Sequence, residues 1–305
     1  MNVLSLFDGM SSGRIALARA GVAVDNYYAS ELDKYAIKVT QANWLETIQL
    51  GDVTKWRDWD IDFASIDLLT AGFPCQAWSS AGKMQGDSDP RGALVHDLID
   101  IWKHVTALNP NLKFMFENVK MKKEFLGYVN GLFGVEPILI NSSLVSAQNR
   151  KRYYWTNIGG VEQPDDLGLV LADIIESGEV DRDKSCSSKI RCGSIIGRRI
   201  NPQTGKRDDY NKHVPISQRL EVRADEKTGT LTTVQKDNVA VNADLTYRKL
   251  TVLECERLQT LPDDYTLVLD ESGKQLVSNS QRYKMIGNGW TADVIAHIFK
   301  ALVLN

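Results

Sequence analysis

The chain has 305 residues, of which 43% are hydrophobic and 25% charged, with a formal net charge of −3. This composition is ordinary for a globular protein of one large domain or two unequal ones, and it excludes disordered and fibrous classes. No apolar run approaches the ~18 residues of a membrane helix, and the first residues lack the basic leader of a signal peptide, so no membrane partner is expected.

The four cysteines, Cys75, Cys186, Cys192 and Cys255, form no Cys-x-x-Cys pair. This spacing argues against a zinc site and a disulfide scaffold, and it predicts a cytoplasmic protein without a bound metal. Charge is uneven, because residues 182–227 hold about twelve Lys or Arg against about six Asp or Glu. The excess indicates either a phosphate-binding surface or a solvated loop region with a chance surplus.

The first predicted unit is a strand at residues 3–7, a glycine-bearing turn at 8–13 and a helix at 14–20. Glycines in such a turn let the backbone approach a ligand, and the N-terminus of the following helix offers free N–H groups. The spacing is not the full dinucleotide fingerprint, so the turn alone is a weak signal for a nucleotide-like ligand.

Acidic residues follow the next two predicted strands. Glu31 comes after the strand at 26–30, and Asp52 after the strand at 47–50. Ligands of open α/β sheets bind outside the carboxyl ends of the strands, and an acid at this distance from the glycine turn commonly accepts hydrogen bonds from ribose hydroxyls. Both residues are therefore candidates for cofactor binding; the alternative is that they are turn and cap residues.

Cys75 lies just after a predicted buried strand that ends at residue 69, with Pro74 before it and a Gly- and Ser-bearing loop after it. This place suits a nucleophile, because the thiolate is the reactive form and needs an electropositive, partly exposed setting. The alternative is a buried thiol that packs as a small apolar side chain, the commoner role of free cysteine.

A helix across residues 94–105 leads to a predicted strand at 112–116, which Glu117 follows. A carboxyl group at the end of a buried strand is a candidate proton donor, and the alternative is a structural acid with a backbone partner.

Predicted strands at 137–142 and 153–156 flank Arg150, Lys151 and Arg152. Three basic side chains at a strand edge indicate phosphate or base contacts, or else a solvated edge.

From residue 161 to 242 the alternation of strands and helices breaks down, which predicts a second, smaller, strand-rich unit with long loops. Within it, residues 227–233 are β-prone. Helical periodicity returns at 250–261, and the last apolar helix is predicted at 292–304.

Six motifs occur in the order found in one enzyme family. They are Phe-Asp-Gly-Met-Ser-Ser-Gly at 7–13, Gly-Phe-Pro-Cys-Gln at 72–76, Glu-Asn-Val at 117–119, Gln-Asn-Arg-Lys-Arg at 148–152, the segment 248–265, and Gly-Asn-Gly at 287–289. Each is weak alone, but the ordered set over nearly the whole length is specific. On these motifs the chain resembles the cytosine-5 DNA methyltransferases that use S-adenosylmethionine, in their compact bacterial or phage form.

The resemblance implies an α/β fold with a doubly wound, mostly parallel Rossmann-like sheet and a smaller strand-rich domain inserted before the C-terminal helix. Residues 1–175 and 275–305 are expected to form the catalytic and cofactor-binding domain, and residues 176–274 the target-recognition domain. Ser11 and Ser12 replace glycines of many members, and Trp290 replaces a small residue of many bacterial ones. These departures resemble the branch that includes the animal de novo methyltransferases.

The catalytic roles implied by the resemblance fall on four residues. Cys75 is expected to add to carbon 6 of cytosine, and Glu117 to donate a proton at ring nitrogen 3. Arg152 would hold the carbonyl oxygen, and Arg150 a flanking phosphate or the same oxygen. Because these groups cannot reach a base inside a duplex, the cytosine is expected to flip out, with the loop at 75–92 closing over it.

The resemblance also implies the binding residues. Phe7 is expected against the adenine, Glu31 at the ribose and Asp52 at the adenine amine. The residues expected to bind S-adenosylmethionine are Phe7, Asp8, Gly9, Gly13, Glu31, Leu32, Asp52, Pro74, Asn288 and Trp290. Those expected to contact DNA are Gln76, Ser79, Arg91, Gln148, Thr230 and Leu231.

The implied substrate is duplex DNA at a short specific sequence, and the enzyme is expected to be a monomer of a prokaryotic or phage-infected cell. A restriction endonuclease encoded nearby is a candidate partner. Three alternatives stay open: the same chemistry on tRNA, a catalytically silent DNA-binding relative, and a dinucleotide oxidoreductase. The basic recognition region favours DNA, the intact Cys75, Glu117 and Arg152 favour an active enzyme, and an oxidoreductase leaves these motifs without a role.

Overall fold

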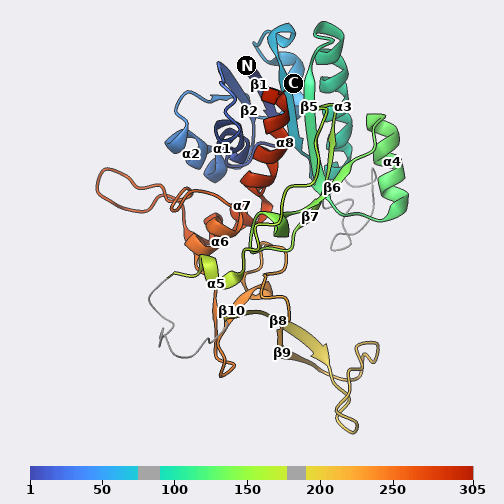
Figure 1. The fold of residues 1–305 in the computed structure, drawn as a ribbon, viewed down its shortest axis with the longest axis vertical. Coiled ribbons are helices and arrows are strands. Elements are labelled where there is room, and N and C mark those ends of the chain that lie inside the picture. The colour runs from blue at the N-terminus through green and yellow to red at the C-terminus, as the bar shows by residue number, and fades with distance from the viewer. Residues whose placement is uncertain (75–89, 177–189, 305) are drawn as a thin grey trace.

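The chain folds around a seven-stranded sheet (Figure 1). A computed structural model describes residues 1–74, 90–176 and 190–304, apart from the side chains of 90–93 and 304. The strands are β1 (Asn2–Leu6), β2 (Asn26–Ser30), β3 (Ile48–Gln49), β4 (Leu68–Gly72), β5 (Lys113–Val119), β6 (Ile138–Asn141) and β7 (Lys151–Thr156). Their order is β3-β2-β1-β4-β5-β7-β6, and only β7 runs antiparallel to its neighbours.

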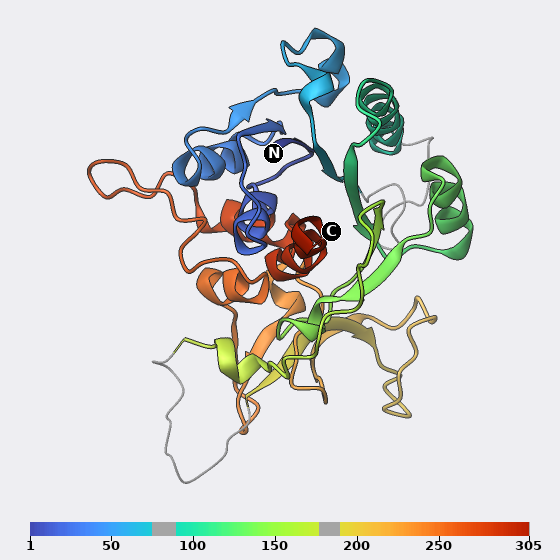
Figure 2. The same ribbon diagram turned by 45° about the horizontal axis from the view of Figure 1, so that its top comes forward.

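Helices cover both faces of this sheet because successive strand residues point to opposite sides. Val3 packs in a cluster with α1 (Ser12–Arg19) and α8 (Ala292–Leu304). Its neighbour Leu4 packs in a second cluster with α3 (Pro90–Leu108) and α4 (Lys123–Phe133). In Figure 2 α8, in dark red, lies on one side of the sheet and α3 and α4 on the other. The doubly wound α/β prediction is confirmed.

The strand order changes direction at β1, which has β2 on one side and β4 on the other. Leu6 at the end of β1 pairs with Ala71 of β4, and Gly72 pairs with Glu117 of β5. The turn at 7–13 and the stretch before Cys75 therefore leave the sheet from adjacent strands. In open α/β sheets this switch point is where ligands bind.

A second, antiparallel sheet has the order β11-β10-β8-β9. Its strands are β8 (Arg191–Arg199), β9 (Ile216–Val222), β10 (Val239–Val241) and β11 (Tyr247–Lys249). β10 pairs with β8 only from Arg191 to Gly193, so the outer parts of β8 and β9 form a two-stranded ribbon. In Figure 1 this ribbon points away from the large sheet.

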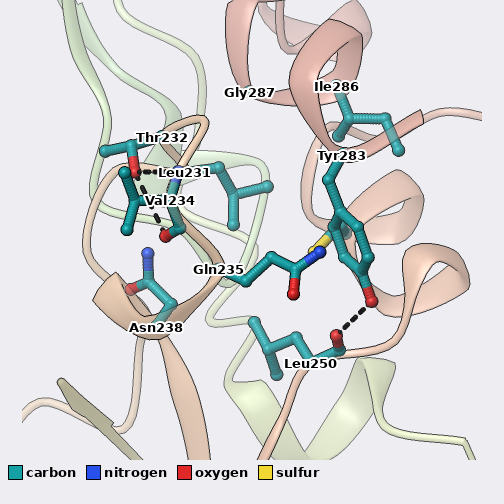
Figure 3. A pocket seen from close by; sticks show the side chains of 10 residues that line it. Leu231, Thr232, Val234, Gln235, Asn238, Leu250, Tyr283, Ile286 and Gly287 are labelled. Atoms are coloured by element: carbon teal, nitrogen blue, oxygen red, sulfur yellow. Dashed lines mark hydrogen bonds between the residues drawn. The ribbon is translucent and has the colours of Figure 1, made fainter. Parts of the chain in front are cut away.

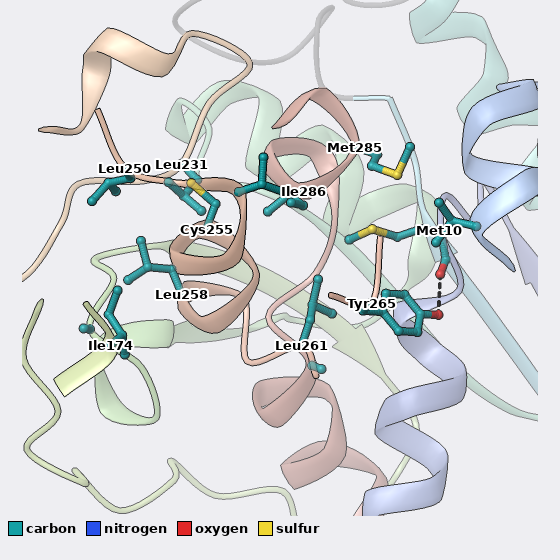
Figure 4. Packing of buried hydrophobic residues seen from close by; sticks show 14 of the residues in the cluster. Met10, Ile174, Leu231, Leu250, Cys255, Leu258, Leu261, Tyr265, Met285 and Ile286 are labelled. Atoms are coloured by element: carbon teal, nitrogen blue, oxygen red, sulfur yellow. Dashed lines mark hydrogen bonds between the residues drawn. The ribbon is translucent and has the colours of Figure 1, made fainter. Parts of the chain in front are cut away.

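A buried apolar cluster joins the second sheet to the turn and helix that follow β1 of the large sheet (Figure 4). α6 (Val252–Leu258) contributes Cys255 and Leu258, and α7 (Asn279–Asn288) contributes Ile286. Met10 reaches the cluster from the turn after β1, and Leu231 from the segment before β10. The last strand of the second sheet ends at Lys249. The predicted limit of the target-recognition domain at residue 274 stays a prediction.

The β-prone segment at 227–233 forms no strand. Within it only Thr228 makes a bridge, to Gln148, and the backbone of Gly229 and Thr230 binds the amide of Asn238 instead. The segment runs along α7 so closely that a Cβ on Gly287 would lie 2.6 Å from the Thr232 carbonyl oxygen. Figure 3 shows the small pocket left between the two. The segment therefore packs closely against α7 and does not pair with a neighbouring strand.

The predicted helices are close to those observed. The last helix has the expected bounds, and the predicted helix at 250–261 is shorter, with Thr251 and Glu254 forming its capping box. None of the helices in the described part of the chain is long and apolar enough to span a membrane. The remaining helices are α2 (Lys34–Asn43), α5 (Leu171–Ile174) and the 3-10 helices Val53–Asp58, Phe63–Ser65, Ser142–Leu144 and Gln235–Asp237.

Candidate active site

A cavity of about 410 Å³ opens at the carboxyl ends of β1, β2, β4 and β5. Its volume lies in the range of small-molecule and cofactor sites. Many of the residues singled out from the sequence meet in its wall, although their positions span almost the whole chain. They are Phe7, Asp8, Gly9, Glu31, Pro74, Glu117, Arg150, Arg152, Asn288 and Trp290.

Glu31 holds the glycine turn in place. Its Oε2 accepts a hydrogen bond from the N–H of Gly9 at 2.8 Å, and its Oε1 accepts from the N–H groups of Leu32 and Asp33 at 2.7 Å. Gly9 has φ +61°, a left-handed conformation that glycine adopts without strain. The carboxylate therefore connects the end of β2 to the turn after β1, and it still faces the cavity.

Asp8 is a largely buried carboxyl group in the same turn. Its Oδ1 accepts a hydrogen bond from the Tyr27 hydroxyl at 2.7 Å, and its Oδ2 binds the Ser11 hydroxyl. Burial raises the pKa of Asp8 to about 6, although the hydrogen bonds from Ser11 and Tyr27 oppose the rise. The charge of the cavity wall at Asp8 therefore changes close to neutral pH.

An Asp8→Asn variant is expected to show a weaker pH dependence of stability. Because folding raises the pKa of Asp8 from 3.8 to about 6, the folded chain binds this proton more tightly, and stability falls as pH rises through this window. The full effect is about 3 kcal/mol, of which about 1.4 kcal/mol is lost between about pH 5 and about pH 7.5, and the amide cannot show it. Urea unfolding at these two pH values measures this part of the effect. Parallel losses of stability in both proteins would contradict the raised pKa.

Glu117 is held from both sides at the other end of the cavity. Its Oε1 pairs with Nε of Arg152 at 2.9 Å, and its Oε2 accepts a hydrogen bond from Nε1 of Trp290 at 3.1 Å. Glu117 pairs with Tyr154 across β5 and β7, so Arg152, two residues along β7, lies on the same face of the sheet. The strand register thus explains why the two predicted catalytic residues meet.

Arg150 lies deeper than Arg152 and is only 3% exposed. Its guanidinium donates hydrogen bonds to the carbonyl oxygens of Leu231 at 3.3 Å, Gly287 at 3.3 Å and Gly289 at 2.8 Å. It therefore connects the segment at 227–233 and the end of α7 to the residue before β7. Its expected contact with phosphate or cytosine stays a prediction.

Three predicted cofactor residues lie outside the cavity wall. Asp52 caps the 3-10 helix Val53–Asp58, because its Oδ1 accepts hydrogen bonds from the N–H of Thr54 at 3.0 Å and from its hydroxyl at 2.9 Å. This is the cap role that the sequence left open. The side chain of Leu32 is exposed, and Gly13 packs between Tyr27 and Trp290.

Gln148 and Leu231 are buried, and the DNA contacts predicted for them stay predictions. Nε2 of Gln148 donates to the carbonyl oxygen of Leu258 at 3.1 Å, and its Oε1 accepts from the N–H of Leu231 at 2.8 Å. In the structure both residues therefore hold the junction between the two sheets. Thr230 is half-buried, and its hydroxyl donates to the carbonyl oxygen of Asn149 at 2.9 Å.

The predicted nucleophile Cys75 lies outside the described residues, as do Gln76, Ser79 and the side chain of Arg91. Pro74, the residue before Cys75, is in the cavity wall. Across 1–74, 90–176 and 190–304, no three His, Cys, Asp or Glu side chains gather in a way that could hold a metal ion.

Asn118 belongs to the site, although only its motif, and not the residue itself, was singled out from the sequence. Its Nδ2 donates a hydrogen bond to the carbonyl oxygen of Phe73 at 3.0 Å, and its side chain is buried. It therefore fixes the stretch that leads to Cys75 against the end of β5. The signal was its place in the motif Glu-Asn-Val, directly after the predicted proton donor.

Comparisons with known proteins point to one enzyme family. The family model for the C-5 cytosine-specific DNA methylase matches residues 1–160 and 161–304. The chain is 28% identical to the type II methyltransferase M.NlaX of Neisseria lactamica, over 97% of this chain and 94% of that one. It is also 28% identical to M1.ScrFI of Lactococcus lactis subsp. cremoris, over 99% and 77%. The fold of the Entamoeba histolytica methyltransferase EhMeth covers 100% of this chain and 99% of that one, with a TM-score of 0.65 and 13% identity.

The cavity at the switch point, the Glu117–Arg152 pair and the match of the family model over both parts of the chain lead to the same result. The chain belongs to the family of C-5 cytosine-specific DNA methylases, enzymes that transfer a methyl group from S-adenosylmethionine to carbon 5 of cytosine in DNA.

Proposed function

We propose that this enzyme methylates a cytosine flipped out of duplex DNA at a specific short sequence, through a covalent adduct between Cys75 and carbon 6. The cavity carries the proposal. One end of its wall is the turn held by Glu31, the other is the Glu117–Arg152 pair, and Pro74, the residue before Cys75 in the sequence, belongs to the same wall. A methyl donor and a base entering from opposite ends would meet there.

The residues at the first end fit S-adenosylmethionine. Phe7 offers a ring for the adenine, Glu31 accepts hydrogen bonds as a ribose site requires, and Asp8 offers a carboxylate to a cationic group. When bound, the cofactor supplies a methyl group on a positively charged sulfur. Asn288 is proposed at the methionine end, and Asp52 would reach the adenine amine only by leaving its cap on Thr54.

Cys75 is proposed to make carbon 5 of cytosine reactive. The thiolate forms a bond to carbon 6, and the electrons of the 5,6 double bond move toward nitrogen 3, where Glu117 supplies a proton. The resulting enamine has a nucleophilic carbon 5, which would form a bond to the methyl group as the methyl–sulfur bond breaks and S-adenosylhomocysteine leaves. Loss of the proton from carbon 5 to a base would then expel the Cys75 thiolate and restore the double bond, and Glu117 would take back the proton from nitrogen 3.

Arg152 is proposed to hold the carbonyl oxygen of the same ring. Its Nε already binds Glu117, so its remaining N–H groups can point at the base while the two side chains keep their relative orientation. A donor fixed in a buried site stabilises negative charge on that oxygen better than water does. Glu117 and Arg152 together would thus bind nitrogen 3 and the carbonyl oxygen of the cytosine ring.

The β8–β9 ribbon supports duplex DNA as the substrate. The major groove of B-form DNA admits a two-stranded β-ribbon. The ribbon and its connecting loop expose Lys206, Lys212 and Arg219, none of which makes an ion pair with another described residue. Tyr210 in the loop is 99% exposed. These side chains are available for phosphate and base contacts.

We also propose that the enzyme acts as a monomer and that a restriction endonuclease is encoded nearby. The names of the bacterial relatives support the second point, because both are type II methyltransferases.

Methyl-transfer assays on duplex DNA, single-stranded DNA and tRNA test the proposed function. We expect 5-methylcytosine in duplex DNA, and bisulfite sequencing should place it at one position of a short recurring sequence. Transfer to tRNA in preference to duplex DNA would contradict the proposed substrate. Methylation without a shared sequence would contradict the proposed specificity.

A further inference from the structure

Trp290 lies between the two ends of the active site. Its only polar atom, Nε1, donates to Oε2 of Glu117 at 3.1 Å, and the side chain is 9% exposed. Its ring packs against two glycines. A Cβ at Gly72 would lie 2.8 Å from Nε1, and a Cβ at Gly13 would lie 3.4 Å from the six-membered ring. The indole therefore fills space that only glycine leaves open.

The bond from Trp290 is the only one that the described residues make to Oε2 of Glu117, while Oε1 is taken by Arg152. The last torsion of a glutamate side chain is broad, so one partner alone leaves the carboxyl plane free to turn. Two donors, one on each oxygen, fix that plane. A buried indole N–H also needs an acceptor, so the contact is favourable for both groups.

We propose that Trp290 is a positioning residue for Glu117, rather than a ligand of the methionine end of the cofactor. It fixes the carboxyl plane so that the proton of Glu117 meets nitrogen 3 of the flipped cytosine. The inference rests on the proposed function. Because Gly72 ends β4 and Gly13 belongs to α1, the same ring also contacts these two elements beside the cavity.

A Trp290→Phe variant tests this inference, because it keeps an aromatic ring on both glycines and removes the N–H. We expect kcat for DNA methylation to fall about 10- to 100-fold, the usual effect of losing one hydrogen bond to a charged group. The KM for S-adenosylmethionine should stay within about twofold, because no cofactor contact is lost. Binding of S-adenosylhomocysteine and the thermal midpoint show that the variant is folded.

Gly72→Ala provides an independent second variant. Its Cβ would displace the indole N–H from Glu117 without changing Trp290, so the same fall in kcat is expected. Trp44→Phe is the matched control, since it removes an indole N–H that donates to the Tyr265 hydroxyl at 3.0 Å, away from the cavity. Its kcat should equal that of the unchanged enzyme.

Two results would overturn the inference while the unchanged enzyme methylates DNA normally. One is an unchanged kcat in Trp290→Phe. The other is a rise of about tenfold or more in the KM for S-adenosylmethionine at constant kcat, which would assign Trp290 to cofactor binding. If the unchanged enzyme methylated none of the cytosine substrates, the proposed function itself would be wrong.

Discussion

A Cys75→Ala variant is expected to lose DNA methylation by a factor of at least about 10⁴, the order seen when a covalent catalyst loses its nucleophile. Carbon 5 of cytosine is a poor nucleophile as long as the ring keeps its 5,6 double bond. Alanine cannot form the bond to carbon 6, so Glu117 and Arg152 would bind a base that stays unreactive. Initial rates of methyl transfer to duplex DNA, compared at saturating cofactor, measure the loss.

Cys255→Ala is the matched control for this thiol. Cys255 is buried in the cluster under α6, and burial raises the pKa of its thiol to about 12, so it is inert as a nucleophile. We expect the control to keep its methylation rate.

The adduct itself can be trapped with duplex DNA that carries fluorine at carbon 5 of the target cytosine. No proton can leave that carbon after methyl transfer, so the bond to Cys75 should persist under denaturing conditions. Methylation by Cys75→Ala at the normal rate, or the same stable adduct in that variant, would contradict the covalent mechanism.

The sequence predicted the parts of the site that depend on local pattern. Apolar strands followed by Asp8, Glu31 and Glu117 indicated an α/β sheet with functional groups at its carboxyl edge, and the structure has this arrangement. The meeting of Glu117 and Arg152 is not local in origin, because the two residues lie on different strands. It follows from the pairing of β5 with β7, one register for the whole strand pair.

The sequence could not separate residues that face the cavity from residues of the same motif that face the protein. Arg150 and Arg152 are two apart, yet Arg150 binds three carbonyl groups and Arg152 binds Glu117. Gln148 is likewise used at the junction of the two sheets. Which partner each side chain meets depends on how the segment at 227–233 and α7 approach, and this long-range packing leaves no periodic signal.

Polar residues at strand ends pose the same problem in a different form. Asp52 and Glu31 both follow a strand, and both accept backbone hydrogen bonds. Only Glu31 is in the cavity wall, because its partner Gly9 belongs to the neighbouring turn, whereas the partner of Asp52 is Thr54 in its own helix. A cap and a binding residue use the same chemistry, so only the position of the donor distinguishes them.

A Glu117→Gln variant is expected to lower kcat by about 10²- to 10⁴-fold, the range for removal of a general acid. The amide keeps the size of the carboxyl group, but its single oxygen replaces only one of the two that bind Arg152 and Trp290. Its NH2 group can donate to nitrogen 3, so affinity for target DNA should change by less than about tenfold. What it cannot do is release a proton as the Cys75 thiolate adds to carbon 6.

The distinction between binding and proton transfer makes this experiment decisive for Glu117. Single-turnover rates with duplex DNA report the chemical step, and a gel-shift titration reports binding. Glu124→Gln is the matched control, because Glu124 is an exposed acid in the first turn of α4, and its rate should be unchanged. If Glu117→Gln kept its rate but bound DNA far more weakly, Glu117 would be a base-binding group only, and the proton at nitrogen 3 would have to come from water.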